Sequence, residues 1–491
     1  MRALVLPHRL LGAFEVPPSK SHAARALLLS AFARGESRIE GFARPGSPSG
    51  GDSGAALRAA RAFGAEVLPQ ADGSLLVRGN GGEPPASGRI DCGNSGTMLY
   101  FCSALAALAS GEWILDGDAQ TRGRPALPLL AALRTLGAEA EGSGPGGGFA
   151  PLRLRGPLAS GGGGRPRVRL ESPTSQYLSA LLLALPFSPR GAELELSLLN
   201  ERPYVGMTLS WLARAGLEAL PSGGAEPPVG AAAAPGGPAA AASQAAPGFP
   251  AAAGGAGDPY SRFLVPGGQT ARPFRSRIPA DWSAAAFLLA AGAAGGGPVE
   301  VQGLSSGDGQ GDEAILGMLR AFGAEVSLKQ DLREEGDGQG RGLVAATVSR
   351  SGPLRPVDLD LNATPDLLPV LAALAALVPG RSVFRNVPQA RIKETDRIAA
   401  MAAALGALGA RTEELPDGLA VEGPLGSRPA TRRGEGGPRP LAVDSYGDHR
   451  VAMALAVLGL GAPFPLAIDQ AESAAVSYPG FWEAIGAELP E

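Results

Sequence analysis

The stretch ILGMLRAFGAE, residues 315–325, carries the pattern that decides the fold. Its apolar side chains recur at three- and four-residue spacing, as in an amphipathic helix, and its glycine suits a helix C-terminal cap. The same pattern recurs as ALRAARAFGAE (56–66), LLAALRTLGAE (129–139), LSWLARAGLE (209–218), MAAALGALGAR (401–411) and FWEAIGAE (481–488). We therefore predict six amphipathic helices, each ending at a glycine and leading into a strand.

A second set of helices alternates with the first. Its members are apolar on nearly every side, which indicates burial rather than a surface position. We predict them at residues 24–33, 98–109, 177–185, 284–294, 367–378 and 451–460. Each follows a polar cluster: SKSHAAR (19–25), GNSGT (93–97), SPTSQ (172–176), ADWS (280–283), NATPD (362–366) and YGDHR (446–450).

These alternating helices, with short strands such as SLLVRG, PLRLRG and GLAVEG, divide the chain into six similar units. Three units fit in each of two α/β domains, and a chain of 491 residues exceeds the size at which one core keeps growing. The third unit is lengthened by an uncharged Gly/Ala/Pro tract at 230–257, which we expect to be a disordered surface loop. Shorter insertions of the same kind occur at 334–342 and 427–440.

The composition excludes several classes of protein. No apolar run is long enough for a membrane span, and Pro7, His8 and Arg9 interrupt the first residues before the apolar region of a signal peptide could form, so we expect a cytoplasmic protein with no membrane partner. The net charge of −4 does not favour nucleic acid. Two cysteines and three histidines show no zinc spacing, and we expect neither a metal nor a cofactor.

Lysine is rare in this chain. Arginine supplies almost all of the 43 basic residues, and the lysines are Lys20, Lys329 and Lys393. Two of them lie in the motifs SKSHAAR and RIKETDR (391–397), where a compact ammonium group could be needed in place of a planar guanidinium. Chance survival of any single lysine is the alternative.

The polar clusters at the helix starts together indicate an anion site. Helix N-termini favour anions, and buried helices packed side by side would direct several N-termini at one face. Each motif alone could be only a helix cap or turn, and the absence of a Gly-Lys pair excludes a P-loop. Like charges about 5 Å apart repel by about 3 kcal/mol at an effective dielectric constant near 20. A shared cleft therefore requires polyanionic ligands to neutralise its cations, which are Lys20, Arg25, Arg124, Lys393, Arg397 and Arg450.

Taken in order, the motifs SKSxxxR, GNSGT, RxRP, TSQ, NxxPD, RIKETDR and YGDHR resemble those of the EPSP synthase family, the 3-phosphoshikimate 1-carboxyvinyltransferases. The resemblance implies a two-domain inside-out α/β barrel with three βαβαββ-type repeats in each domain. It implies one discontinuous domain, residues 1–18 and 279–491, and an inserted domain, residues 19–278. It also implies a monomer that transfers the enolpyruvyl group of phosphoenolpyruvate to the 5-hydroxyl of shikimate 3-phosphate and releases phosphate.

The resemblance also implies the site residues. Asp366 would be the base, Glu394 the acid, and Lys20 would act beside them and touch both substrates. The shikimate 3-phosphate site would consist of Lys20, Ser21, Arg25, Thr174, Ser175, Gln176 and Tyr204. The phosphoenolpyruvate site would consist of Asn94, Gly96, Arg124, Arg397 and Arg450, with Asp448 supporting Arg450. Asp366, Gln389 and Lys393 complete the substrate-binding set, while Arg391 and Asp396 are interpreted as structural.

Several positions depart from the family pattern. Tyr100 stands where a basic residue is expected, Glu201 where a serine is expected, and Val476 where many members have lysine. These changes affect the expected phosphate contacts and glyphosate sensitivity more than the reaction class.

Two alternatives remain open at this point. UDP-N-acetylglucosamine enolpyruvyl transferase shares the fold but uses a reactive cysteine, whereas Cys92 and Cys102 lie in apolar surroundings typical of inert thiols. A non-catalytic anion-binding relative would have lost charged residues at random, yet the charged positions named above are all present.

Overall fold

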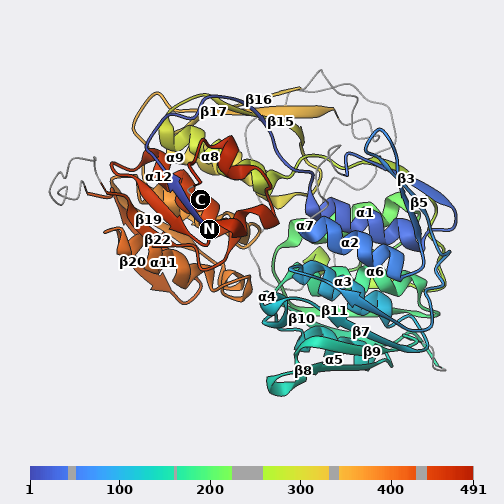
Figure 1. Cartoon of the computed structure of the whole chain (residues 1–491). Coiled ribbons are helices and arrows are strands. Elements are labelled where there is room, and N and C mark those ends of the chain that lie inside the picture. Colours follow the sequence, from blue (N-terminus) through green and yellow to red (C-terminus); the bar gives the residue numbers. More distant parts are fainter. Residues whose placement is uncertain (43–50, 160–162, 224–257, 331–341, 427–438, 490–491) are drawn as a thin grey trace.

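The computed structural model describes residues 1–42, 51–159, 163–223, 258–330, 342–426 and 439–489. The chain forms two domains that lie side by side, and both termini belong to the orange and red one (Figure 1). One apolar core is built from residues 23–278, and the other from residues 3–16 and 282–485. The predicted two-domain α/β fold is confirmed. The boundaries predicted at residues 18 and 278 lie between the two cores and remain a prediction.

The predicted insertion at 230–257 lies outside the described residues, as do 334–341 and 427–438 of the shorter ones. Across the described ranges, no helix combines the length and the apolar character needed to span a bilayer.

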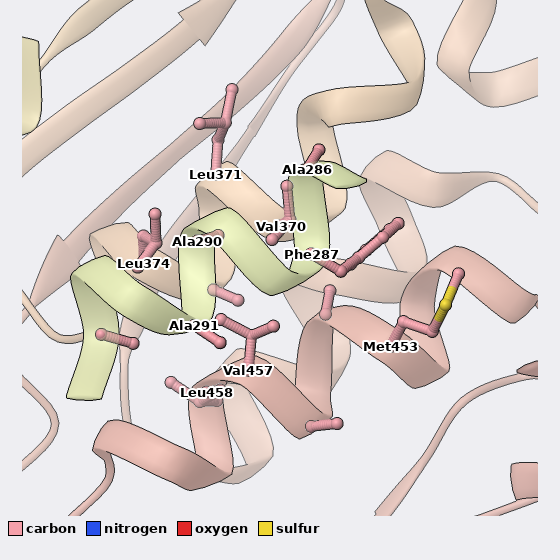
Figure 2. Close-up of a cluster of buried hydrophobic side chains, with 14 of the residues drawn as sticks. Ala286, Phe287, Ala290, Ala291, Val370, Leu371, Leu374, Met453, Val457 and Leu458 are labelled. Atoms are coloured by element: carbon pink, nitrogen blue, oxygen red, sulfur yellow. The ribbon is translucent and has the colours of Figure 1, made fainter. Parts of the chain in front are cut away.

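All six predicted buried helices are present. They are α1 (Lys20–Phe32), α3 (Gly96–Ala106), α6 (Ser175–Ala184), α8 (Trp282–Gly295), α10 (Leu368–Ala375) and α12 (His449–Gly461). Figure 2 shows how the last three pack: Phe287 and Ala291 of α8, Val370 of α10 and Val457 of α12 belong to one buried cluster. These helices are surrounded by other parts of the protein, which explains why they are apolar on every side. Their many alanines let them pack closely against one another.

The amphipathic helices are also present. They are α2 (Gly51–Ala62), α5 (Leu127–Thr135), α7 (Arg202–Arg214), α9 (Ile315–Phe322), α11 (Arg397–Ala407) and the four-residue α13 (Phe481–Ala484). The glycine after each one has a positive φ, as predicted: Gly64, Gly137, Gly216, Gly323, Gly409 and Gly486. At Gly323, for example, φ is +99° and its N–H bonds to the carbonyl of Arg320, a conformation that other residues rarely adopt.

Within the described ranges, six small sheets surround the buried helices. In the first domain their strand orders are β14 (Arg275–Arg277), β3 (Glu36–Glu40), β5 (Leu75–Arg78), β4 (Glu66–Pro69); β6 (Gly88–Asp91), β7 (Glu112–Asp116), β9 (Phe149–Arg155), β8 (Glu139–Ser143); and β10 (Arg167–Ser172), β11 (Gly191–Leu199), β13 (Arg262–Pro266), β12 (Leu220–Pro221). In the second they are β2 (Gly12–Glu15), β15 (Val299–Ser305), β17 (Leu343–Ser349), β16 (Glu325–Gln330); β18 (Asp358–Asp360), β19 (Gly380–Arg385), β21 (Gly418–Gly423), β20 (Arg411–Leu415); and β22 (Leu441–Asp444), β23 (Leu466–Asp469), β1 (Arg2–Val5).

Every sheet begins with a parallel pair and continues antiparallel, so one βαβαββ unit is repeated six times. Segments distant in sequence complete three of the units: β14 closes the first, β2 the fourth and β1 the sixth. In the sixth unit, a single bridge from Leu4 to Glu488 takes the place of the fourth strand.

The chain passes between the domains twice, and the two crossings pair with each other. The amide of Ser19 donates to the carbonyl of Pro279 at 2.8 Å, and the amide of Asp281 donates to the carbonyl of Pro17 at 2.9 Å. The two connections therefore form one paired link beside the N-termini of α1 and α8, where the domains face each other.

Candidate active site

A cavity lies between the domains, at the N-terminal ends of the buried helices. Its wall includes residues from the first turns of α1, α3, α6 and α12, and Asp366 from the 3-10 turn η5 (Pro365–Leu367) that precedes α10. The first turn of α8 joins the same region because its cap Asp281 accepts a hydrogen bond from the Lys20 amide at 3.2 Å. The predicted convergence of helix N-termini is therefore observed.

Arg397, at the start of α11, forms the centre of the charged cluster. Its side chain is 1% exposed and contacts three carboxylates. Nη1 lies 2.6 Å from Asp366 Oδ1, Nη2 lies 2.5 Å from Glu394 Oε2, and Nε lies 2.8 Å from Asp448 Oδ2. Asp448 also caps α12, accepting from the amides of Arg450 and Val451. Arg397 thus holds the two proposed catalytic carboxylates in one fixed arrangement.

Two further arginines hold the opposite sides of these carboxylates. Arg124 approaches from the first domain, with Nη2 2.7 Å from Glu394 Oε1 and Nη1 donating to the Ile392 carbonyl at 3.1 Å. Arg450 Nη2 lies 3.0 Å from Asp366 Oδ2, and its Nη1 lies 3.9 Å from Asp312. Both Asp366 and Glu394 therefore lie between cations.

The surrounding charges determine how these carboxylates ionise. Burial raises the pKa of Asp366, but Arg450, Lys393 and Arg397 outweigh it and hold the pKa below its usual range. Burial likewise opposes ionisation of Glu394, and Arg124 and Arg397 lower its pKa well below its usual range. Burial together with Asp366 raises the pKa of Asp312 to about 7.

Arg25 occupies the first-domain side of the cavity. Its guanidinium lies 5.0 Å from the ring centroid of Phe101 and donates to Thr208 Oγ1 at 2.8 Å and to the carbonyls of Ser21 and Tyr204. Burial lowers the pKa of Arg25 to about 9, which still leaves it charged at neutral pH. Among the described residues, no carboxylate lies within ion-pair distance of Arg25, so its charge is available to an anionic ligand.

The two lysines of the site each form an ion pair with a carboxylate at the cavity wall. Lys20 Nζ lies 2.9 Å from Asp52 at the start of α2, and Lys393 Nζ lies 2.5 Å from Glu201 Oε1. The other oxygen of Glu201 accepts from Thr174 Oγ1, the Ser175 amide and Ser175 Oγ at 2.9–3.0 Å. The residue that replaces the expected serine therefore sits among groups expected to bind phosphate.

Two buried polar atoms at the cavity wall have no hydrogen-bond partner among the described residues. They are Arg450 Nη1 and His449 Nε2. Buried polar groups in folded proteins are nearly always paired, so we expect a water molecule or a polar ligand to contact these atoms. Burial lowers the pKa of His449 to about 3, so its ring is neutral at physiological pH.

Most of the predicted site residues line the cavity directly. They are Lys20, Ser21, Arg25, Asn94, Gly96, Arg124, Ser175, Gln176, Tyr204, Asp366, Lys393, Glu394 and Arg450. Thr174, Arg397 and Asp448 lie behind that wall and hold Glu201, Asp366 and Glu394 in place. Gln389 is buried and donates to the Asn362 carbonyl at 2.8 Å, so it supports the wall from behind instead of lining it.

Sequence reasoning did not assign several wall residues to the site, among them Asp52, Thr97 and His449. Thr97 and His449 lie inside quoted motifs, GNSGT and YGDHR, so their position beside assigned residues was the available signal. Asp52 follows no motif and reaches Lys20 only through the packing of α2 on α1.

Two other predictions concern residues near the site. Arg391 binds Asp396 at 2.7 Å and Glu414 at 3.2 Å, and Asp396 caps α11 by accepting from the Ala399 amide. These contacts stabilise the start of α11, which agrees with the structural role interpreted for Arg391 and Asp396. Tyr100 is buried and donates to the Pro125 carbonyl at 2.8 Å, next to Arg124.

Val476 contacts the start of α2 through its backbone, because its carbonyl lies 2.4 Å from where a Cβ on Gly51 would be.

The side chains of Glu394, Asp448 and His449 approach closely enough to hold a metal ion. Arg397 already binds both of these carboxylates, and Arg124 binds Glu394 as well, so the position is occupied by guanidinium charge. The cysteines do not form a reactive site either. Cys92 and Cys102 are buried, and burial raises the pKa of both thiols.

Comparison with known proteins identifies the family. The family model described as EPSP synthase (3-phosphoshikimate 1-carboxyvinyltransferase) matches residues 6–224 and 255–485. A 3-phosphoshikimate 1-carboxyvinyltransferase of Acetivibrio thermocellus is 35% identical over 473 residues, covering 96% of this chain and 94% of the relative. One from Halorubrum lacusprofundi is 38% identical over 489 residues, with the same coverage.

The fold agrees with a solved structure. The EPSP synthase from Acinetobacter baumannii superposes with a TM-score of 0.72 over the full length of both chains, at 23% identity. The family match, the relatives and the shared fold all lead to one conclusion: the chain belongs to the EPSP synthase family, the 3-phosphoshikimate 1-carboxyvinyltransferases of the shikimate pathway.

Proposed function

We propose that this chain transfers the enolpyruvyl group of phosphoenolpyruvate to the 5-hydroxyl of shikimate 3-phosphate in the cavity between its two domains. The observation that carries the proposal is that five cations, Lys20, Arg25, Arg124, Lys393 and Arg450, line one cavity around the ionised carboxylates Asp366 and Glu394, while Arg397 holds both carboxylates from behind. Both substrates are phosphorylated carboxylic acids, so both supply the anionic charge that such a site requires.

Shikimate 3-phosphate binds on the first-domain side. Arg25 has a charge without a carboxylate partner, and Ser21, Gln176 and Tyr204 offer hydrogen-bonding groups beside it. Thr174 and Ser175 bind the phosphate at the N-terminus of α6, where the helix dipole favours an anion. Lys20 and Lys393 add charge from either side of the cleft.

Phosphoenolpyruvate binds beside Arg124 and Arg450, with Arg397 behind them. These arginines are paired with Glu394 and Asp366. The carboxylate and phosphate of phosphoenolpyruvate take over part of this pairing, while Asn94 and Gly96 allow the ligand to approach the start of α3.

The two carboxylates divide the proton transfers. The 5-hydroxyl oxygen of shikimate 3-phosphate attacks C2 of phosphoenolpyruvate, and Asp366 accepts the proton of that hydroxyl. Glu394 donates a proton to the C3 methylene. The resulting tetrahedral intermediate then loses phosphate and one proton from its new methyl group, which restores the enol. Lys20 stabilises negative charge beside the reacting atoms.

The proton donor must be protonated before it acts. Arg124 and Arg397 lower the pKa of Glu394 and keep it ionised. When phosphoenolpyruvate neutralises these arginines, the pKa of Glu394 rises and the residue can take up a proton. Substrate binding and acid activation are thereby coupled through Arg124.

The deciding experiment measures phosphate release from phosphoenolpyruvate with two competing acceptors. We expect release with shikimate 3-phosphate and none with UDP-N-acetylglucosamine. Release only with the sugar nucleotide would overturn the proposal, and no release with either would favour a non-catalytic relative.

We also propose that the enzyme is a cytoplasmic monomer that acts on small molecules and not on nucleic acid. The two domains of one chain enclose the cavity, so the proposed reaction requires no second copy of the chain. Light scattering after size exclusion measures this directly, and a dimer mass at micromolar concentration would contradict it.

A further inference from the structure

Glu201 is a buried anion at the meeting point of the two domains. Its side chain is 3% exposed, and its carboxylate takes donors from Thr174, Ser175 and Lys393. Three of these donors belong to the start of α6 in the first domain, and the fourth, the Lys393 ammonium, belongs to the second. Glu201 therefore binds both domains at once.

The backbone at Glu201 is unusual as well. The residue has φ 56° and ψ 41°, the left-handed region that side chains other than glycine seldom adopt. It directly precedes α7, yet its side chain does not cap that helix and reaches the N-terminus of α6 instead. A strained conformation that directs a buried carboxylate away from its own helix suggests a function beyond stability.

The neighbouring contacts join the same two domains. The Glu201 amide donates to the Asn362 carbonyl at 3.3 Å, and Asn362 Nδ2 donates to Asn200 Oδ1 at 2.9 Å. The segment 200–201 is therefore one side of a contact that must break when the cleft opens.

We infer that Glu201 is a resident anion in the phosphate subsite, which latches the empty cleft through Lys393 and must be displaced by the phosphate of the substrate. This rests on the proposed function for the identity of that phosphate. The hydroxyls of Thr174 and Ser175, the Ser175 amide and Lys393 form a set of donors suited to phosphate oxygens, and the carboxylate already uses all of them. A second anion cannot share these donors without strong repulsion from the first.

Two consequences follow from the latch. Phosphate binding is weakened, because the substrate competes with an anion that is tethered to the site at high effective concentration. The Glu201–Lys393 pair also holds the two domains together before substrate binds. Without this pair, the domains should separate more widely.

Inorganic phosphate is the probe for the first consequence. Calorimetric titration of the full chain should show phosphate binding at least tenfold tighter in Glu201→Ser and Glu201→Gln than in the parent protein. Glu195→Gln is the matched control, since Glu195 is an exposed carboxylate on β11, the strand that ends shortly before Glu201, and its substitution should leave the affinity unchanged. Equal or weaker phosphate binding in both Glu201 variants would overturn the inference.

Small-angle scattering tests the second consequence. Ligand-free Glu201→Gln and Lys393→Met should both have a larger radius of gyration than the parent protein, because each breaks the same bridge. Only the Glu201 variants should bind phosphate more tightly, since Lys393→Met removes a phosphate donor. An unchanged radius of gyration in both variants would contradict the latch. Glu201→Gln preserves the shape of the side chain, so it keeps the test valid if Glu201→Ser folds poorly.

The outcome is separable from that of the proposed function. Absence of phosphate release from phosphoenolpyruvate and shikimate 3-phosphate would defeat the function, whereas the phosphate titration and the scattering experiment measure the latch without turnover.

Discussion

Arg397 Nη1 lies 2.6 Å from Asp366 Oδ1, and it joins the start of α11 to the turn before α10. The same guanidinium also holds Glu394 and Asp448, so one buried arginine sets the positions of both proposed catalytic groups. Its position explains why the segment RIKETDR concentrates charge at the N-terminus of the helix α11. Arg397 binds the proton-transfer groups, while Lys393 and Glu394 reach into the cavity.

Replacing Asp366 by Asn should reduce kcat by about 10²- to 10⁴-fold, the usual contribution of a positioned acid or base. The amide can still accept a hydrogen bond from Arg397 but cannot take the proton of the 5-hydroxyl, so KM should change much less than kcat. Phosphate-release kinetics measure both values. Asp358→Asn, at an exposed carboxylate on the neighbouring strand β18, is the control, and a kcat for Asp366→Asn within a few-fold of the parent would contradict the assigned base.

Replacing Lys20 by Arg should reduce kcat/KM by about tenfold or more, equivalent to at least about 1.4 kcal/mol of transition-state stabilisation. The half-buried ammonium fits between Asp52 and the cavity, and the larger planar guanidinium cannot occupy that space in the same geometry. Steady-state kinetics give the comparison. Lys329→Arg, on the exposed strand β16, makes the same chemical change far from the site and should have no effect; equal rates for the two variants would indicate that Lys20 survives by chance.

Replacing Arg397 by Met should lower the free energy of unfolding by about 3–5 kcal/mol. The substitution leaves Asp366, Glu394 and Asp448 close together in a buried site without their shared cation. Urea denaturation measures the loss. Arg381→Met provides the control because Arg381 is half-exposed and pairs with Glu413 at the surface, where an ion pair contributes about 1 kcal/mol or less. A loss no larger than that of the control would show that the carboxylates do not depend on Arg397.

Acid should destabilise the protein partly through His449. Burial lowers the pKa of His449 from 6.5 to about 3, so the unfolded chain takes up a proton at a pH where the folded protein does not. The stability contributed by the neutral ring is present above pH 6.5 and is lost as the pH falls toward 3. His449→Asn removes this titration, and its free energy of unfolding should fall less than that of the parent between pH 6.5 and 4.

Asp312 acts in the opposite direction and supplies the check. Its pKa is raised to about 7, so its contribution to stability is present below pH 3.8, the usual value, and is lost as the pH rises through about 7. Asp312→Asn should therefore make the loss of stability toward acid steeper.

Parallel stability curves for the parent and the His449 variant would rule out the buried neutral ring as a cause.

Local sequence patterns predicted the secondary structure and the class of site. Helical periodicity and the glycine after each amphipathic segment depend on a few adjacent residues, which is why the helices and the positive φ at Gly323 follow directly from the chain. The ordered polar motifs at helix starts likewise predicted an anion site, because a helix N-terminus favours anions wherever the helix is placed.

The sequence by itself thus determined the six repeated units and the residues at their helix mouths. The tertiary structure alone decided which charges meet. Arg124 pairs with Glu394, and Glu201 pairs with Lys393. Each pair joins the two domains and two residues that are far apart in the sequence. It also decided that β1, β2 and β14 complete units distant in sequence. The physical reason is that periodicity and capping depend on neighbours in the chain, whereas ion pairs and sheet closure depend on the docking of separate units.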